Sequence, residues 1–278
     1  MKIPKKHLNK ISILDDGMTK YNRQWKERYI HTELLSKDWD LCVEEYTTNG
    51  VGRDIYVFPC FTQRYCSELI TMAENADRWS RARHQNYPTF DIELEWIGVE
   101  NPYLEFLGEY IYPLAMNCFT WGGWDNETAT IERDYKNEPA TLVAETFLVK
   151  YKTGAVSDSK LHEEYGTCKM TYLPIHMDDS IASLLIPIND DYTGGGTKFP
   201  KQNVTLRPPA GNCILFPGGI THRHGARIVT EGTRYVIATF INIINQKGDG
   251  YDHSGKLLAK NDRAEGGIRA YKRDREKT

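Results

Sequence analysis

The chain has 278 residues, with 35 Lys plus Arg against 38 Asp plus Glu, a formal net charge of −3 and 40% hydrophobic residues. This composition excludes a disordered polymer, which would have fewer apolar residues or more net charge. The near-neutral charge also argues against a dedicated nucleic-acid binder, because such proteins usually carry a basic excess that neutralises phosphates. We therefore expect one large β or α/β domain, or a core domain with an appendage.

Both ends of the chain are predicted to be tails. Residues 1–24 are basic and irregular, and residues 246–278 are dense in charge and glycine. No stretch approaches the roughly 18 apolar residues that span a bilayer. The opening residues, MKIPKKHLNKISILDDG, lack the apolar segment of a secretory signal. We therefore expect no transmembrane segment and no signal peptide in this chain.

Residues 25–140 mix helix and strand signals. The run DIYVFPCF at 54–61 has the aromatic and β-branched content of a strand. Thr62 then caps a predicted helix that runs to Trp79, because apolar residues recur there at helical spacing. A second helix is predicted over 102–116, bent or ended by its proline.

Residues 141–245 show a different pattern. Short apolar runs (TFLVKY, SLLIPI, CILF and YVIATFINI) alternate with Gly-rich and Pro-rich turns. Short strands separated in this way predict a β-sandwich or a small barrel. The six cysteines are scattered along the chain without a CxxC pair, so the sequence leaves their pairing open.

A candidate metal site lies in this β-rich half. Residues separated by one in a strand point to the same face, so His176 and Asp178 can present an imidazole and a carboxylate to one ion. His222 or His224, on a later strand, can add a second imidazole. Two His and one carboxylate on one side of an ion leave open positions for a co-substrate and O2, as in non-haem Fe(II) oxygenases.

Arg234 adds an anion-binding group. It opens the run RYVIATFINI, in which strand alternation places Arg234, Val236, Ala238 and Phe240 on one face. An arginine on a mostly apolar face is unfavourable unless it meets an anion. The planar guanidinium suits a carboxylate such as the far carboxylate of 2-oxoglutarate.

Each signal has an ordinary structural explanation. His-x-Asp occurs by chance, an isolated strand arginine is usually solvated, and either His222 or His224 could be a core or surface histidine. The order, the strand setting, the spacing and the trailing arginine together favour a metal site. Periodicity does not choose between His222 and His224. We expect His31, His84 and His162 to be surface residues.

Longer stretches of the chain resemble the catalytic domain of the procollagen lysyl hydroxylases. The resemblance covers roughly residues 25 to 242. It rests on WKERYIH (25–31), DIYVFPCFTQRYCSEL (54–69), YPTFDIELEWIG (87–98), FLVKY (147–151), HMDDS (176–180), GGGTKF (194–199), FPGGITHRHG (216–225) and GTRYVIATF (232–240).

The resemblance implies a fold and a set of site residues. The fold is α+β, mainly β, with a double-stranded β-helix (jelly-roll) core at 141–245 and flanking helices within 25–140. The implied iron ligands are His176, Asp178 and His224, because the family's metal histidine precedes its co-substrate arginine by ten residues. Arg234 is then the residue for the far carboxylate of 2-oxoglutarate, and Tyr151 is similar to a tyrosine beside that carboxylate.

The implied activity is Fe(II)- and 2-oxoglutarate-dependent hydroxylation of a peptidyl lysine in collagen-like X-Lys-Gly sequences. It consumes O2 and releases succinate and CO2, and ascorbate is expected to rescue oxidised iron. The resemblance also implies a homodimer and, if this chain behaves as the family does, the lumen of the endoplasmic reticulum.

The chain departs from the family in ways that bear on the substrate. The segments between Cys118 and Ala144 and from Thr153 to Thr171 are longer, and Met177 stands where the family has a histidine. Alternatives therefore stay open: a hydroxylase of peptidyl proline or of a small molecule, or a non-catalytic jelly-roll binding module. A nucleic-acid dioxygenase shares the core but usually adds a basic surface.

Overall fold

The computed structural model describes residues 17–81, 89–119, 140–153, 170–178 and 180–245. Most of both predicted tails and of the two long segments lies outside these residues, as do His84, His162 and Cys168. The predicted domain bounds at 24, 140 and 245 stay predictions. The other five cysteines are free thiols.

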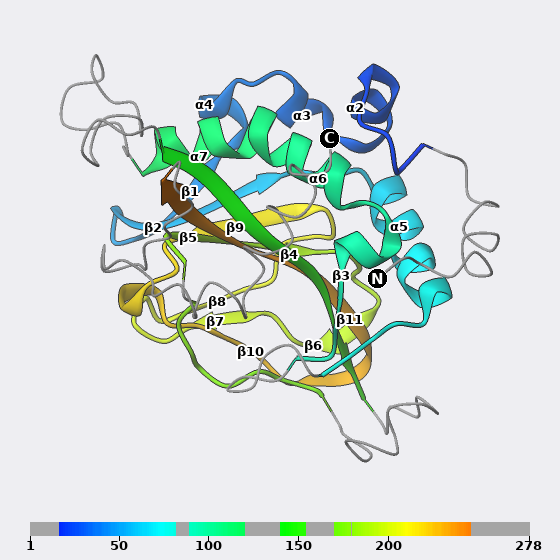
Figure 1. Cartoon of the computed structure of the whole chain (residues 1–278). Coiled ribbons are helices and arrows are strands. Elements are labelled where there is room, and N and C mark those ends of the chain that lie inside the picture. The colour runs from blue at the N-terminus through cyan, green and yellow to red at the C-terminus, as the bar shows by residue number, and fades with distance from the viewer. Residues whose placement is uncertain (1–16, 82–88, 120–139, 154–169, 179, 246–278) are drawn as a thin grey trace.

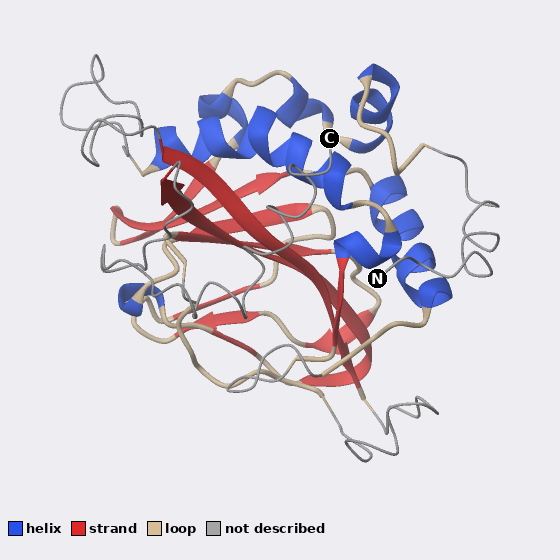
Figure 2. Cartoon of the chain, in the orientation of Figure 1, coloured by secondary structure: helices blue, strands red, loops and turns tan. Residues whose placement is uncertain are grey.

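Two antiparallel sheets form the centre of the molecule. The larger has the order β1-β2-β9-β5-β11-β4-β3, with β6 also paired to β11, and the smaller has the order β10-β7-β8. Figure 2 shows the helices gathered on the outer side of the larger sheet. This is the mainly β jelly-roll core with flanking helices that was expected. The strands are β1 (Glu44–Thr48), β2 (Val51–Pro59), β3 (Asp91–Glu93), β4 (Ala140–Lys152), β5 (Ala182–Pro187), β6 (Tyr192–Gly194), β7 (Thr197–Phe199), β8 (Val204–Leu206), β9 (Asn212–Phe216), β10 (Gly225–Ala226) and β11 (Val229–Asn245).

The helices come mostly from the first half of the chain (Figure 1). They are α2 (Arg23–Tyr29), α3 (Thr32–Leu35), α4 (Trp39–Cys42), α5 (Gln63–Ala76), α6 (Glu100–Phe106) and α7 (Tyr112–Cys118), with 3₁₀ turns at Leu94–Ile97 and Ile220–His222. An aromatic cluster packs these helices together, and within it the rings of Phe61 and Tyr65 stack with centroids 3.9 Å apart. In the part of the chain that the structure describes, no helix has the length and apolar character needed to cross a bilayer.

Helix α5 is the predicted helix after Thr62. The Thr62 hydroxyl accepts a hydrogen bond from the Tyr65 backbone N–H, which caps the first turn. The helix ends at Ala76, three residues before the predicted end, because Asp77 adopts a left-handed conformation with φ 48°.

The second predicted helix continues through its proline. Helix α6 joins α7 through a π-helical turn, Leu107–Ile111, in which the Tyr112 N–H bonds to the Leu107 carbonyl. Pro113 has no N–H to donate, and its ring would crowd a regular preceding turn. The wider π turn accommodates the ring, so the helix extends to Cys118.

Glu109 on this π turn joins the N-terminal segment to the helices. The Tyr21 hydroxyl donates to its carboxylate at 2.7 Å, and the ammonium groups of Lys26 and Lys37 lie 3.1 Å and 3.3 Å from it. Partial burial by itself would raise the pKa of Glu109, but these three donors outweigh it and lower the pKa to about 2. Residues from Tyr21 onward therefore belong to the packed structure.

Strand register decides which residues of the larger sheet face the smaller one. In antiparallel pairs, residues directly opposite share a face. Arg234 lies opposite Tyr151, and Phe240 of the same strand lies opposite Ser183 on β5. These four residues share one face, because Arg234 and Phe240 are an even number of positions apart. The other face packs on the helices, where the Tyr103 hydroxyl lies 2.8 Å from Thr239 Oγ1.

Candidate metal centre

His176 and His224 are brought together by a backbone bridge. The His176 N–H donates to the His224 carbonyl and the His224 N–H donates to the His176 carbonyl, both at 2.8 Å. The expected strand setting is wrong for most of this region. His176 and His224 form an isolated bridge, Asp178 follows it without strand structure, and His222 ends a 3₁₀ turn.

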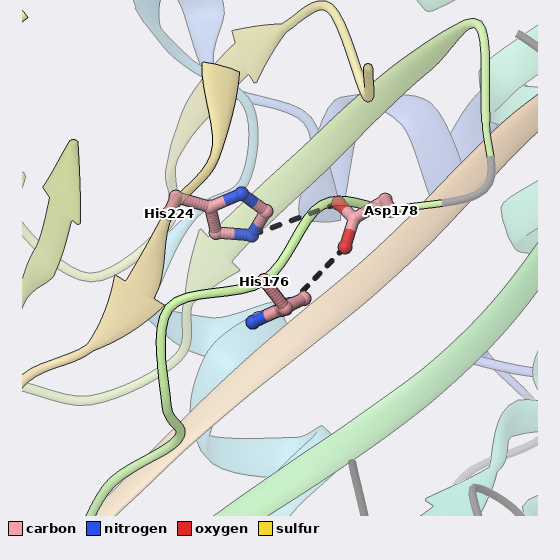
Figure 3. A group of neighbouring side chains, drawn as sticks. All are labelled: His176, Asp178 and His224. Carbon is pink, nitrogen blue, oxygen red and sulfur yellow. Dashed lines mark ion pairs between the residues drawn. The ribbon is translucent and has the colours of Figure 1, made fainter. Parts of the chain in front are cut away.

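The two imidazoles and the Asp178 carboxylate converge on one point (Figure 3). Asp178 Oδ1 lies 3.2 Å from His176 Nε2, and Asp178 Oδ2 lies 3.6 Å from His224 Nε2. One donor atom from each of the three residues lies within 4.8 Å of the others, and all three side chains are buried. The structure therefore assembles two imidazoles and one carboxylate in a space that a single ion can occupy.

The backbone sets the tautomer of both rings. His176 Nδ1 lies 2.8 Å from the Pro174 carbonyl, and His224 Nδ1 lies 3.2 Å from the His222 carbonyl. A carbonyl oxygen only accepts, so each Nδ1 carries the proton and donates it. Each Nε2 then turns a lone pair toward Asp178, which is the arrangement that metal-binding histidines require.

Only one oxygen of the Asp178 carboxylate accepts a hydrogen bond from the residues that the structure describes. Ser183 Oγ donates to Asp178 Oδ2 at 2.6 Å, and Ser180 Oγ lies 2.8 Å from Ser183 Oγ. Oδ1 is buried and accepts no hydrogen bond within the described residues. A carboxylate whose two oxygens face nitrogen lone pairs is unfavourable unless a cation lies among them. The donor set therefore fits a divalent metal ion.

Burial disfavours the charged forms of all three side chains at this site. Burial by itself would raise the pKa of Asp178, but His224, His176 and the Ser183 hydrogen bond outweigh it, so the pKa is lowered. Burial lowers the pKa of His224, so that imidazole stays neutral near neutral pH. The pKa of His176 is raised, because its contact with Asp178 outweighs burial.

His222 takes a different direction from His224. Its Nε2 lies 2.8 Å from the Arg53 carbonyl and its Nδ1 lies 3.0 Å from Thr221 Oγ1. The strand argument left these two histidines equivalent, but the 3₁₀ turn that ends at His222 separates their side chains. Met177, between the buried residues His176 and Asp178, is 43% exposed and so lies outside the buried cluster.

Arg234 is a buried cation on the same sheet face as Ser183. Its side chain is 2% exposed, its Cζ lies 5.3 Å from the centre of the Tyr151 ring, and its Nη2 lies 3.5 Å from Thr197 Oγ1. Among the described residues it has no ion pair, and its Nε has no hydrogen-bond partner. A guanidinium buried in this state fits an anionic ligand.

Tyr151 stays protonated beside Arg234. Burial raises the pKa of Tyr151 to about 12, and the Arg234 charge only partly opposes that rise. The phenol is therefore a hydrogen-bond donor at neutral pH. Its assignment to a carboxylate-binding role came from the resemblance and stays a prediction.

Sequence reasoning missed Ser183 and Thr197. Ser183 orients Asp178, and Thr197 contacts Arg234. A signal for Ser183 is present in the sequence, because it is a polar residue at the start of the apolar run SLLIPI. Its role depends on its hydrogen bond to Asp178, and hydrophobic periodicity does not predict such a contact.

No protein-family model matches the chain. The sequence is 28% identical over 228 residues to procollagen-lysine,2-oxoglutarate 5-dioxygenase 2 of Mus musculus, which covers 78% of this chain and 27% of that protein. It is 29% identical over 235 residues to a multifunctional procollagen lysine hydroxylase and glycosyltransferase of Caenorhabditis elegans, covering 80% of this chain and 28% of that protein. The chain thus spans about a quarter of the length of these relatives. The resemblance to the lysyl hydroxylases is confirmed.

Among solved structures, the chain is similar to a viral collagen prolyl hydroxylase from Paramecium bursaria Chlorella virus-1. The sequence identity is 14%, the TM-score is 0.40, and the match covers 68% of this chain and 96% of that one.

Proposed function

We propose that this chain is an Fe(II)- and 2-oxoglutarate-dependent dioxygenase that hydroxylates a peptidyl lysine in collagen-like X-Lys-Gly sequences and releases succinate and CO2. One observation carries the proposal. The buried Asp178 carboxylate faces the Nε2 atoms of His176 and His224. Arg234, which has no ion pair among the described residues, lies on the same face of the larger sheet as Ser183, the residue that hydrogen-bonds Asp178.

His176, Asp178 and His224 would hold the iron. Iron(II) bound by two imidazoles and one carboxylate supplies open coordination positions and the redox chemistry that activates O2. Pro174 and His222 keep the protons on the Nδ1 atoms, so that both Nε2 atoms stay ligands. Ser183 holds the Asp178 carboxylate in place by its 2.6 Å hydrogen bond.

Arg234 and Tyr151 would bind the far carboxylate of 2-oxoglutarate. The guanidinium neutralises that carboxylate and the Tyr151 phenol can donate to it. Burial keeps water away from both groups, which strengthens their attraction to the anion.

Support for lysine as the target comes from the relatives, which are named as procollagen-lysine dioxygenases. Three finer features also belong to this proposal, and they come from the family resemblance alone. They are the rescue of oxidised iron by ascorbate, assembly as a homodimer and a setting in the lumen of the endoplasmic reticulum.

Peptide turnover tests the proposal. The purified chain is incubated with Fe(II), 2-oxoglutarate, ascorbate and O2, and with matched X-Lys-Gly and X-Pro-Gly peptides. Succinate is measured, and mass spectrometry locates the added oxygen. We expect oxygen on lysine, no turnover by His176→Ala, and normal turnover by His31→Ala, whose half-buried ring lies outside the site.

Each other outcome has a distinct meaning. Oxygen on proline would mean that the target residue is proline and not lysine, while the proposed chemistry would stand. Binding of metal and 2-oxoglutarate without turnover would indicate a non-catalytic module. Unchanged turnover by His176→Ala would exclude the site altogether.

A further inference from the structure

Two buried hydrogen-bond donors near the predicted carboxylate site have no partner. The Tyr192 hydroxyl and Arg234 Nε make no hydrogen bond within the described residues. Tyr192 is 7% exposed and Arg234 is 2% exposed. A buried donor without a partner is destabilising and rare, so two of them in one region indicate a missing acceptor.

Strand register places the two side chains on the same face of the sheet. Tyr192 on β6 lies directly opposite Gly232 on β11. Gly232 precedes Arg234 by two positions, so both point to the same side of β11. Tyr192 therefore faces the interior between the two sheets, as Arg234 does.

Gly195 shows how closely the two side chains approach. A Cβ atom at Gly195 would lie 2.7 Å from Tyr192 Cε2 and 3.2 Å from Arg234 Cδ. Cε2 is two bonds from the Tyr192 hydroxyl oxygen, and Cδ is bonded to Arg234 Nε. Both side chains thus pack so closely against Gly195 that a Cβ atom there would clash with Tyr192, and the two unpartnered donors belong to side chains that meet at this glycine. Gly195 also has φ 69°, which few other residues adopt.

The charge near these two side chains favours an anion. The Arg207 guanidinium lies 4.4 Å from the centre of the Tyr192 ring, and its Nη2 donates to the Tyr192 carbonyl at 2.6 Å. Within the described residues, neither Arg207 nor Arg234 forms an ion pair. A buried guanidinium whose Nε has no partner among those residues, beside an unpartnered hydroxyl, is the pattern of a carboxylate site, and the exposed Arg207 adds positive charge next to Tyr192.

We infer that Tyr192 is a further binding residue for 2-oxoglutarate. Its hydroxyl donates to one oxygen of the far carboxylate while the Arg234 guanidinium binds the same group, and Gly195, having no Cβ, lets the two side chains approach. The inference rests on the proposed function and extends its carboxylate site beyond Arg234 and Tyr151.

Tyr192→Phe tests the inference, because it removes only the hydroxyl. The full chain is loaded with Zn(II) in place of iron, and calorimetry measures the binding of 2-oxoglutarate and of 2-oxopentanoate, which has a methyl group in place of the far carboxylate. We expect Tyr192→Phe to weaken 2-oxoglutarate about tenfold, as for loss of one hydrogen bond to a charged group, and to leave 2-oxopentanoate unchanged. Tyr46→Phe, on β1, is the matched control and should alter neither affinity.

Thermal unfolding separates binding from folding. Because the Tyr192 hydroxyl makes no hydrogen bond to any residue that the structure describes, the metal-loaded Tyr192→Phe protein should be as stable as the wild type. 2-Oxoglutarate should then raise its melting temperature less than it raises that of the wild type. Equal 2-oxoglutarate affinity in both proteins, or equal weakening of both ligands, would overturn the inference and leave the proposed function standing. Failure of the wild type to bind 2-oxoglutarate would overturn both.

Discussion

Replacing Arg234 with methionine is expected to stabilise the ligand-free protein and to abolish its binding of 2-oxoglutarate. The side chain is 2% exposed, has no ion pair among the described residues, and makes one hydrogen bond at the long distance of 3.5 Å. Methionine has a similar length and adds no charge. Under the proposed function, the ligand-free protein therefore holds a buried charge that gains its partner only when 2-oxoglutarate binds.

The size of the effect follows from the contacts of Arg234. Burial of an unpaired charge is unfavourable by several kcal/mol. The Tyr151 ring offsets up to about 2 kcal/mol as a cation–π partner, and the Thr197 contact offsets about 1 kcal/mol at most. We expect Arg234→Met to raise the free energy of unfolding by about 1–3 kcal/mol. For a chain of this size, each kcal/mol corresponds to roughly 2–4 °C in melting temperature.

Lys150→Met provides a matched comparison. Lys150 is also a buried cation on β4, but its ammonium lies 2.8 Å from a Glu74 carboxylate oxygen. Removing it leaves that carboxylate without its partner, so we expect a loss of stability. Urea denaturation of both variants, with and without 2-oxoglutarate, measures the contrast. A loss of stability in ligand-free Arg234→Met comparable to that of Lys150→Met would refute the reasoning, because it would mean that Arg234 is already satisfied by the protein.

Three further predictions concern the metal and the pH. Ser183→Ala should weaken Zn(II) binding about 10- to 100-fold in a chelator competition, because Asp178 loses its orienting donor, whereas Ser67→Ala on the exposed face of α5 should not. Zn(II) at 100 times its dissociation constant should stabilise the wild type by about 2.7 kcal/mol in urea titrations, and a chelator should reverse the gain; the same gain in His176→Ala would place the ion elsewhere. The pKa of Glu109 is lowered to about 2, so its contribution to stability is complete above its ordinary value and is lost as the pH falls toward 2. Glu109→Gln should flatten that part of the stability profile measured by urea unfolding; an unchanged profile would contradict the role of Glu109.

Local patterns in the sequence predicted much of the fold. The apolar runs became β4, β5, β9 and β11, and the cap at Thr62 began α5 as expected. These features depend on residues that are close together in the chain, so their spacing can be read directly from the sequence. The π turn before Pro113 was not expected, because its form depends on how the helix packs as well as on the proline.

The sequence by itself also determined which residues are candidates for the site. Residue type and spacing alone indicate His176, Asp178 and Arg234 as candidates. The strand argument used for the histidines was wrong, because the chain around them forms a single bridge and a 3₁₀ turn.

Only the tertiary structure decided how these residues combine. Spacing left His222 and His224 open and the resemblance implied His224; the structure places His224 beside Asp178. It also brings Ser183 to that carboxylate and packs Tyr192 and Arg234 against Gly195. The physical reason is that each of these contacts joins segments that are separate in the chain. Their geometry depends on strand register and on turns in the backbone, which short-range periodicity does not contain.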